Sequence, residues 1–222
     1  MIPETHDPES GPRWQRRKDA RPTELLEAAF HEFVTRGFTA TRLEDIAKRA
    51  GCTKGTIFIY FENKEELFKE MVRHILLPHL AETEQRVEQH EGSMRDLLET
   101  ILRTKFERMS RPPFSGMPKL IFGEVAHFPD MARFYHEEVI ARSHRTIAQV
   151  LERGIELGEF RPMDTSNVAR TAVAPLILAS LWMHSFAPHT NEHIDPSAFF
   201  EASLGVLLRG ITRDVVPGGS HE

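Results

Sequence analysis

The sequence predicts an all-α fold, and three observations support this. Apolar residues recur at three- and four-residue steps, as Leu26, Phe30 and Phe33 do before Gly37. Residues that cap helix N-termini precede such runs, as in the pair Asn63 and Glu66, three positions apart. No stretch alternates apolar and polar residues in the way a half-buried strand does. The chain is therefore expected to be helical throughout, with short connections.

Each expected helix has its own start and stop signals. Gly37 ends the first helix, because glycine enters the left-handed backbone region that follows a helix. The helix opened by Asn63 is expected to bend near Pro78, and Asp195 followed by Pro196 opens the last one. In chain order we expect helices at 23–36, 42–50, 54–61, from 63 past the bend, at 93–110, 117–127, 129–158 and 164–186, and from 195 onward.

The most informative stretch is 41–64, TRLEDIAKRAGCTKGTIFIYFENK, which has the layout of a helix-turn-helix. A capping pair is followed by a small buried face, a glycine where the chain must turn, a second cap and an apolar anchor. In order these are Thr41 with Glu44, Ile46 with Ala47, Gly51, Thr53 and Ile57. Such a unit lays its second helix in the major groove of DNA.

Around this unit the sequence resembles the DNA-binding domain of the tetracycline-repressor (TetR) family. The resemblance runs from about Pro22 to Met71 and rests chiefly on RGFTATRLEDIAKRAG, TKGTIFIYF and NKEELF. It implies a helix-turn-helix head at 21–67 and a helical body for ligand binding and dimerisation at 68–213. We expect residues 1–20 to be a disordered basic arm and 214–222 a flexible tail.

The resemblance, together with the chemistry of the side chains, gives candidate DNA contacts. Thr41 and Lys64 are each expected at a helix N-terminus, where backbone N–H groups favour a phosphate. The recognition helix and its surroundings supply the others, so that the full set is Thr41, Arg42, Thr53, Lys54, Gly55, Thr56, Phe58, Ile59, Tyr60 and Lys64.

Two of these residues depart from the common pattern of the family. Phe58 stands where the family often has Tyr, so a phenolic hydrogen bond to phosphate is lost, and simple packing is an equal alternative. Ile59 offers no hydrogen bond, but its methyl groups suit a thymine methyl. Because Ile57 and Phe61 define the inward face, Ile59 is expected to point outward.

The formal net charge of −5 is unevenly distributed. Residues 12–61 hold ten Lys and Arg against six Asp and Glu, which leaves eighteen against twenty-seven in the rest. Phosphate binding depends on local basic density, so a basic head on an acidic body suits DNA. The arm residues Arg13, Arg16, Arg17, Lys18 and Arg21 form a basic cluster that either is simply solvated or lies along phosphates or a minor groove.

Several features bear on the compartment and on chemistry. The single cysteine excludes an intramolecular disulfide, and the polar start MIPETHDPESGP lacks the apolar core of a signal peptide, so we expect a cytoplasmic protein. The apolar run 171–187 is interpreted as a buried helix. The histidines at 184, 189 and 193 do not share a helical face, and we expect neither a metal site nor a cofactor.

For the body, the resemblance implies a homodimer through the last two helices, here 167–186 and 197–209, and a ligand pocket. The first of these helices is apolar on nearly all faces, although core burial explains part of that. Candidate pocket residues, each of which is also a candidate for plain core packing, are Phe106, Phe114, Met117, Phe122, His127, Phe128, Phe134, Tyr135, Trp182, Met183, His184 and Phe186.

The sequence thus predicts a dimeric repressor that binds a palindromic DNA operator and is released by a small, largely apolar effector. Two alternatives stay open. One is a DNA-binding protein of the same fold without an effector, constitutive or architectural. The other is an enzyme, although the chain has no glycine-rich phosphate loop, nucleophile elbow or HExxH sequence.

Overall fold

The computed structural model describes residues 13–124, 127–192 and 194–213. Apart from one isolated β-bridge between Phe160 and Thr212, the regular structure in these residues is helical. The helices are α1 (Arg13–Arg36), α2 (Leu43–Arg49), α3 (Lys54–Tyr60), α4 (Lys64–Ile75), α5 (Leu77–Gln89), α6 (Met94–Met109), α7 (Met117–Glu124), α8 (Pro129–Tyr135), α9 (Arg142–Glu156), α10 (Thr165–Ser185) and α11 (Pro196–Ile211). A π-helical segment, His136–Ala141, joins α8 to α9, and short 3-10 turns occupy Phe114–Gly116 and Ala187–His189.

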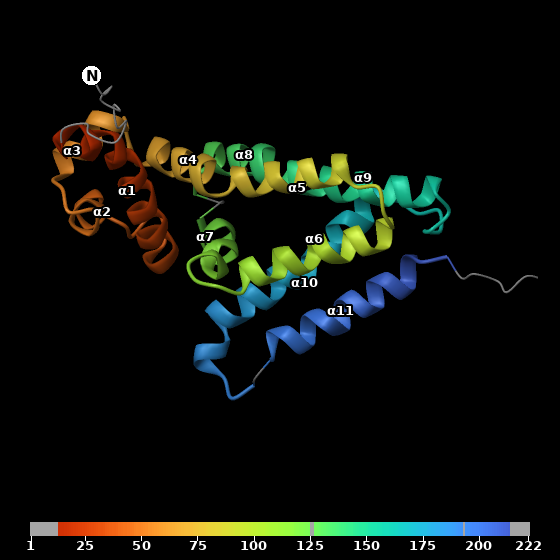
Figure 1. The fold of residues 1–222 in the computed structure, drawn as a ribbon. Coiled ribbons are helices and arrows are strands. Elements are labelled where there is room, and N and C mark those ends of the chain that lie inside the picture. Colours follow the sequence, from red (N-terminus) through yellow and green to blue (C-terminus); the bar gives the residue numbers. More distant parts are fainter. Residues whose placement is uncertain (1–12, 125–126, 193, 214–222) are drawn as a thin grey trace, which may run out of the picture.

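The molecule is elongated, with a small head at one end (Figure 1). Helices α1 to α3 form the head, and α4 and α5 lead away from it along α8 and α9. Helix α7 packs against both α1 and α10, so it lies between head and body. The all-α prediction and its order of helices are confirmed.

The beginning of α1 differs from the expectation. The helix starts at Arg13 and runs through Pro22, so the expected disorder is wrong for the backbone of residues 13–20. Pro22 removes one helical hydrogen bond but fits the helical φ, and the Arg, Lys and Ala residues before it are good helix formers. Residues 1–12 and the tail 214–222 lie outside the described residues, as do the side chains of the arm before Arg21.

Most of the expected caps are present. The side chains of Asn63, Ser93, Asp164 and Asp195 each accept a hydrogen bond from a backbone N–H in the first turn of the helix that follows. For Asn63 the donor is the N–H of Glu66, at 2.8 Å. These bonds satisfy N–H groups that have no partner within the helix.

The expected bend in the fourth helix is a break. Helix α4 ends at Ile75 and α5 begins at Leu77, with Leu76 between them and Pro78 in the first turn of α5. Proline lacks the N–H that would continue the hydrogen-bond ladder, which is why the break precedes it. The two helices therefore meet at a joint on Leu76.

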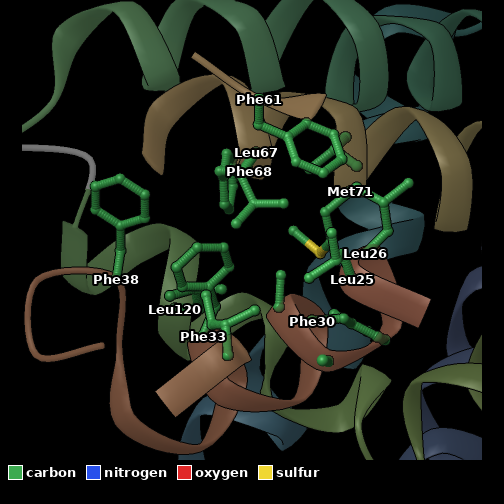
Figure 2. Packing of buried hydrophobic residues seen from close by; sticks show 14 of the residues in the cluster. Leu25, Leu26, Phe30, Phe33, Phe38, Phe61, Leu67, Phe68, Met71 and Leu120 are labelled. Carbon is green, nitrogen blue, oxygen red and sulfur yellow. The ribbon is translucent and has the colours of Figure 1, made fainter. Parts of the chain in front are cut away.

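Two hydrophobic clusters form the core. The head cluster is rich in aromatic rings and joins α1, α3 and α4 to residues of the body, among them Leu120 of α7 (Figure 2). Within it, the ring centroid of Phe38 lies 5.3 Å from that of Phe33 and 5.8 Å from that of Phe68. The body cluster is mainly aliphatic and is built from α5, α6, α9, α10 and α11.

The head cluster does not stop at the boundary expected between residues 67 and 68. Leu67 and Phe68 are both fully buried in it, and so are Met117 and Met131 of the body. Head and body thus share a continuous apolar contact. Because protein interiors are closely packed, a displacement of α7 or α8 also displaces the head residues that pack against it.

Candidate DNA-binding surface and ligand cavity

The helix-turn-helix of α2 and α3 is anchored from inside. Ile46 and Ala47 of α2 and Ile57 of α3 are buried, and Gly51 turns the chain between them with a φ of +64°. Ile57 is the one buried residue of α3, so its contact with α2 decides which face of this seven-residue helix points outward.

The outer face of α3 gathers most of the predicted DNA contacts. Ile59 is 75% exposed and Phe58 is 50% exposed, so Ile59 points outward as expected. Thr53, Lys54 and Gly55 are also exposed, as is Arg42 at the start of α2, while Thr56 and Tyr60 are half-buried. A Cβ on Gly55 would meet nothing closer than 3.8 Å within the protein, so packing alone does not require glycine there.

Lys54 is paired within the protein. Its Nζ lies 2.8 Å from an Oε atom of Glu44 and 5.9 Å from the centroid of the Phe58 ring. The hydrogen bond from Lys54 lowers the pKa of the Glu44 carboxyl. Because the pair is exposed, it is a weak interaction that a phosphate can replace.

Two predicted caps of this unit differ in detail. Thr53 is the N-cap residue of α3, but its hydroxyl meets the Thr56 hydroxyl at 3.1 Å instead of a backbone N–H. The prediction that Thr41 caps α2 is wrong, because Arg42 occupies the N-cap position. The Thr41 side chain is buried and its hydroxyl donates to the carbonyl oxygens of Gly37 and Glu32, which lie at the end of α1. The hydroxyl is therefore engaged within the protein, by carbonyl oxygens at the end of the preceding helix.

Lys64 is committed to a role inside the head. Its Nζ donates to the carbonyl oxygens of Phe38 (2.8 Å), Thr41 (3.1 Å) and Thr39 (3.4 Å). The ammonium also lies 4.6 Å from the centroid of the Phe38 ring. Burial lowers its pKa, and the carboxylate of Glu124 acts in the opposite direction. An ammonium has three donors, so this arrangement competes with the predicted phosphate contact.

Of the basic arm, Arg21 is described. Its guanidinium donates to the carbonyl oxygen of Ala50 at the end of α2 and to the carboxylate of Glu24, both at 3.0 Å. The contact ties α1 to α2, and Arg21 is thus a residue of the head. The other basic side chains of the cluster lie outside the described residues.

A cavity of about 230 Å³ lies in the body between the two hydrophobic clusters. Its walls come from α5, α6, α7, α8, the π-helical segment, α9 and α10. Four predicted pocket residues line it, namely Phe114, Met117, Phe122 and Tyr135. Leu76, the residue at the joint between α4 and α5, also lines it.

The other predicted pocket residues lie elsewhere. Phe106, Met183 and His184 line a separate neighbouring cavity, and the Phe106 ring stacks on that of Phe200 at 4.3 Å. Phe128 packs on Phe38, and Phe134 lies under the guanidinium of Arg73. Trp182 and Phe186 contact each other near the end of α10, and His127 is exposed in a turn. The type of a residue does not reveal which side of a helix it occupies, so aromatic character alone does not locate the lining of a cavity.

Sequence reasoning missed the polar residues of the cavity. They are Lys105 and Arg108 on α6, His79 on α5, and Ser143 and His144 on α9. Lys105 and Arg108 lie three residues apart and so share one face of α6. Phe106 and Met109 have the same spacing and share the adjacent face. The three-residue spacing can be read from the sequence. Only the packing of α6 against α9 shows that the charged pair faces inward.

Comparison with known proteins agrees with both ends of this architecture. Residues 25–71 match the model of bacterial regulatory proteins of the tetR family, and residues 88–196 match the tetracyclin repressor-like C-terminal domain. The chain belongs to the TetR family. This family consists of transcriptional regulators and not of enzymes.

Individual relatives cover most of the chain. The HTH-type transcriptional repressor KstR2 of Mycobacterium tuberculosis is 28% identical over 200 residues, 89% of this chain and 96% of the relative. KstR2 of Rhodococcus jostii is 31% identical over 72% of this chain and 75% of the relative. The solved structure of the M. tuberculosis protein, described as a ketosteroid transcriptional regulator, superimposes with a TM-score of 0.65 and 26% identity, over 87% of this chain and 96% of that one.

Helix α7 connects the cavity of this TetR-family protein to its head. Met117, Pro118, Ile121 and Phe122 line the cavity, while Leu120 and Ile121 belong to the head cluster. At the end of the helix, a carboxylate oxygen of Glu124 accepts a hydrogen bond of 2.5 Å from the Thr39 hydroxyl. One short helix therefore touches both sites.

Part of the apolar surface of α10 and α11 is uncovered. Leu178 of α10 and Val206 of α11 are more than half exposed, and Met183 and Phe186 extend the surface toward the end of α10. A largely apolar groove of about 350 Å³ runs between the two helices.

Helix α10 is long and apolar enough to cross a membrane by length and composition, yet it carries part of the body core. In the described residues no group of three His, Cys, Asp or Glu side chains is placed to hold a metal ion, and His193 lies outside them.

Proposed function

We propose that this protein is a homodimeric transcriptional repressor that binds a palindromic operator and is released by a small molecule bound in the body cavity. The observation that carries the proposal is the outward face of α3. An isoleucine that is 75% exposed in the last turn of the recognition helix is not held there by core packing. Its methyl groups fit the C5-methyl group of thymine in the major groove.

The remaining outer residues supply the polar contacts to DNA. Thr53, Lys54 and Arg42 donate hydrogen bonds to phosphates or base edges, and Gly55 permits close approach of the backbone. When Lys54 contacts DNA, it gives up its ion pair with Glu44. The Glu44 carboxylate then lies near the interface without that partner. Acting on DNA, the protein works in the cytoplasm.

A second copy of the chain is needed on two grounds. A helix of seven residues reads few base pairs, and dimers of such units read two half-sites about one helical turn or more apart. The uncovered apolar surface of α10 and α11 also needs a partner, since exposed apolar patches of this kind mark interfaces. Two copies packed through these helices cover it.

Sedimentation velocity tests the interface. Leu178→Glu and Val206→Glu place charges on the proposed contact and should yield monomers. Leu157→Glu is the matched control, because Leu157 is equally exposed but lies at the end of α9. Dimers that survive both substitutions would place the interface elsewhere.

Two elements connect the cavity to the head, and through them a bound ligand can release the protein from its operator. Leu76 lines the cavity at the joint with α4, and α7 lines it while holding Thr39 through Glu124. A ligand that pushes either element changes the orientation of the head, and so the spacing of the two heads in the dimer. A nearly complete switch requires roughly 5.5 kcal/mol of differential affinity between the two orientations.

Selection of bound sites from a random DNA pool, at a stated salt concentration, tests the central claim. A palindromic consensus is the expected result and supports a dimeric sequence reader. A consensus of one half-site would refute the dimeric reading, and no enrichment would refute the operator-binding role. A member of this fold without an effector would also give the palindrome, but no ligand of the cavity would then weaken binding.

A further inference from the structure

The cavity contains positive charge that no carboxylate of its described lining balances. Lys105 Nζ donates to the Ser143 hydroxyl at 3.0 Å, and in the part of the chain that the structure describes it has no carboxylate partner. Arg108, one turn along α6, has neither a hydrogen bond nor an ion pair from its side chain in those residues. The described lining includes no Asp or Glu. Two cations thus face an otherwise mostly apolar space.

Such an arrangement is unfavourable when the cavity is empty. Withdrawing a charge from water is costly unless it is paired, and these two half-buried cations also repel each other. Burial, reinforced by Arg108, lowers the pKa of Lys105 to about 8. Burial also lowers the pKa values of His79 and His144, and nearby cations lower them further. Glu82 is the acid that acts on Arg108 and His79. It lines a neighbouring crevice that Arg108 also lines, and it is not among the residues that line the cavity.

The missing counter-ion defines the chemistry of the ligand. We infer that the cavity binds an amphipathic monocarboxylate, with its carboxylate between Lys105 and Arg108 and its hydrocarbon part against the apolar wall of α7 and α10. This inference rests on the proposed function, because it names the class of the effector. A neutral apolar molecule fills the same space but brings no negative charge to the two cations.

The rest of the lining fits this orientation. Ser143, whose hydroxyl accepts the hydrogen bond from Lys105, and Tyr135 add hydroxyl groups to the lining. Ile121 and Phe122 of α7, with Val173 and Ile177 of α10, offer hydrocarbon surface. At the ~30 Å³ that a water molecule occupies in the liquid, the cavity of about 230 Å³ holds roughly eight groups of that size. That is the size of a medium-chain or aromatic acid.

Matched probes with one hydrocarbon tail test the inference. Binding of octanoate, octan-1-ol and octylamine to the full-length protein is measured by calorimetry at pH 7. Octanoate should bind at least tenfold more tightly than octan-1-ol, and octylamine should not bind. Lys105→Met should abolish the preference for octanoate over octan-1-ol, and Arg108→Met should reduce it independently.

Lys69→Met is the matched control. Lys69 also lies on a helix, but its ammonium is paired with Glu66 on the outside of α4 at 2.7 Å. Removing that charge changes the net charge of the protein as Lys105→Met does, and should leave the preference for octanoate unchanged. A loss of preference in both variants would mean that net charge, and not the cavity, selects the anion, which overturns the inference.

The pH dependence gives a second readout. Between pH 7 and 9 octanoate stays ionised and Arg108 stays charged, while Lys105 loses its proton. His79 and His144, whose pKa values are lowered from 6.5, are neutral throughout, as is the buried Tyr135, whose pKa is raised. The other charged or titratable neighbours are Arg170 and His136 beside His144, and Glu82 beside Arg108. The affinity for octanoate should therefore fall as the pH rises through about 8, and it should not do so in Lys105→Met.

The outcomes separate this inference from the proposed function. Equal binding of octanoate and octan-1-ol, or binding of neither, overturns the inference, while operator binding by the dimer is unaffected. Selective octanoate binding that leaves operator affinity unchanged supports the anion site and refutes release through the cavity. Selective binding together with operator release supports both.

Discussion

The head and the body each hold a half-buried lysine, and the surroundings of the two ammonium groups differ. In the head, Lys64 donates to three backbone carbonyls within 3.4 Å and lies on an aromatic ring. In the body, Lys105 donates to one hydroxyl and faces a cavity beside another cation. Burial lowers the pKa of both. A cation whose donors are all used stabilises the fold, whereas one with donors left over is ready for a ligand.

The apolar packing of the two regions differs in the same way. Aromatic rings fill the head cluster. The described residues that this cluster shares with the cavity lining come from α7, from Leu76 and from the body segments beside them. The body cluster packs beside an open space. A filled head keeps α3 in one orientation for DNA, while a body with a cavity can respond to a small molecule.

The largest effect should come from the interior of the head. Ile57→Ala removes the buried anchor of α3 and should cost about 3 kcal/mol of unfolding free energy, as large-to-small core substitutions do. Ile59→Ala, two residues away and exposed, should change stability by less than about 0.5 kcal/mol. Urea denaturation measures both.

Ile59→Ala, which should hardly change stability, should instead change the affinity for DNA. Ile59→Ala should lose affinity mainly for operators with a thymine at one position, by about 1 kcal/mol or more. Equal losses on every operator variant would show that Ile59 has no base contact.

Lys64→Met should have the next largest effect. It keeps the aliphatic stem on Phe38 but removes hydrogen bonds to three carbonyls, which should cost on the order of 2 kcal/mol in urea denaturation. Lys54→Met, which breaks an exposed pair, should cost less than about 1 kcal/mol. If instead Lys64→Met is as stable as the wild type and lowers the salt dependence of DNA binding, the lysine is a phosphate contact, as its position in the sequence suggested.

Lys105→Met should act on stability in the opposite direction. The folded protein holds the pKa of Lys105 at about 8 against an ordinary 10.5, so between these values the unfolded chain binds more protons. The contribution of Lys105 to the unfolding free energy therefore rises with pH from about 8 to 10.5 and is lowest below 8. Lys105→Met should be more stable than the wild type at pH 7, with the difference shrinking by pH 10. A difference independent of pH would mean that Lys105 is solvated.

The smallest effect on stability is expected at the contact between the two regions. Thr39→Val removes the hydrogen bond to Glu124 and should cost less than about 1 kcal/mol, because the pair is exposed. A ligand of the cavity should still bind with unchanged affinity for the free protein, but should weaken operator binding less than in the wild type. Unchanged release would leave the joint at Leu76 as the sole route.

The sequence by itself determined the helices, their caps and the recognition unit. The cap at Asn63, the glycine turn at Gly51 and the outward direction of Ile59 depend on neighbours within a few residues, so local spacing predicts them. The same local logic failed at Thr41, because the carbonyls that bind its hydroxyl belong to the preceding helix.

The tertiary structure alone decided the cavity. Its walls come from elements between residues 76 and 177, and the side of α6 that faces inward is set by α9 and α10. Spacing within α6 places Lys105 and Arg108 on one face, but it cannot tell a solvated face from one turned toward a cavity. That distinction depends on which apolar surfaces pack together across the chain, and only the folded arrangement of the helices supplies it.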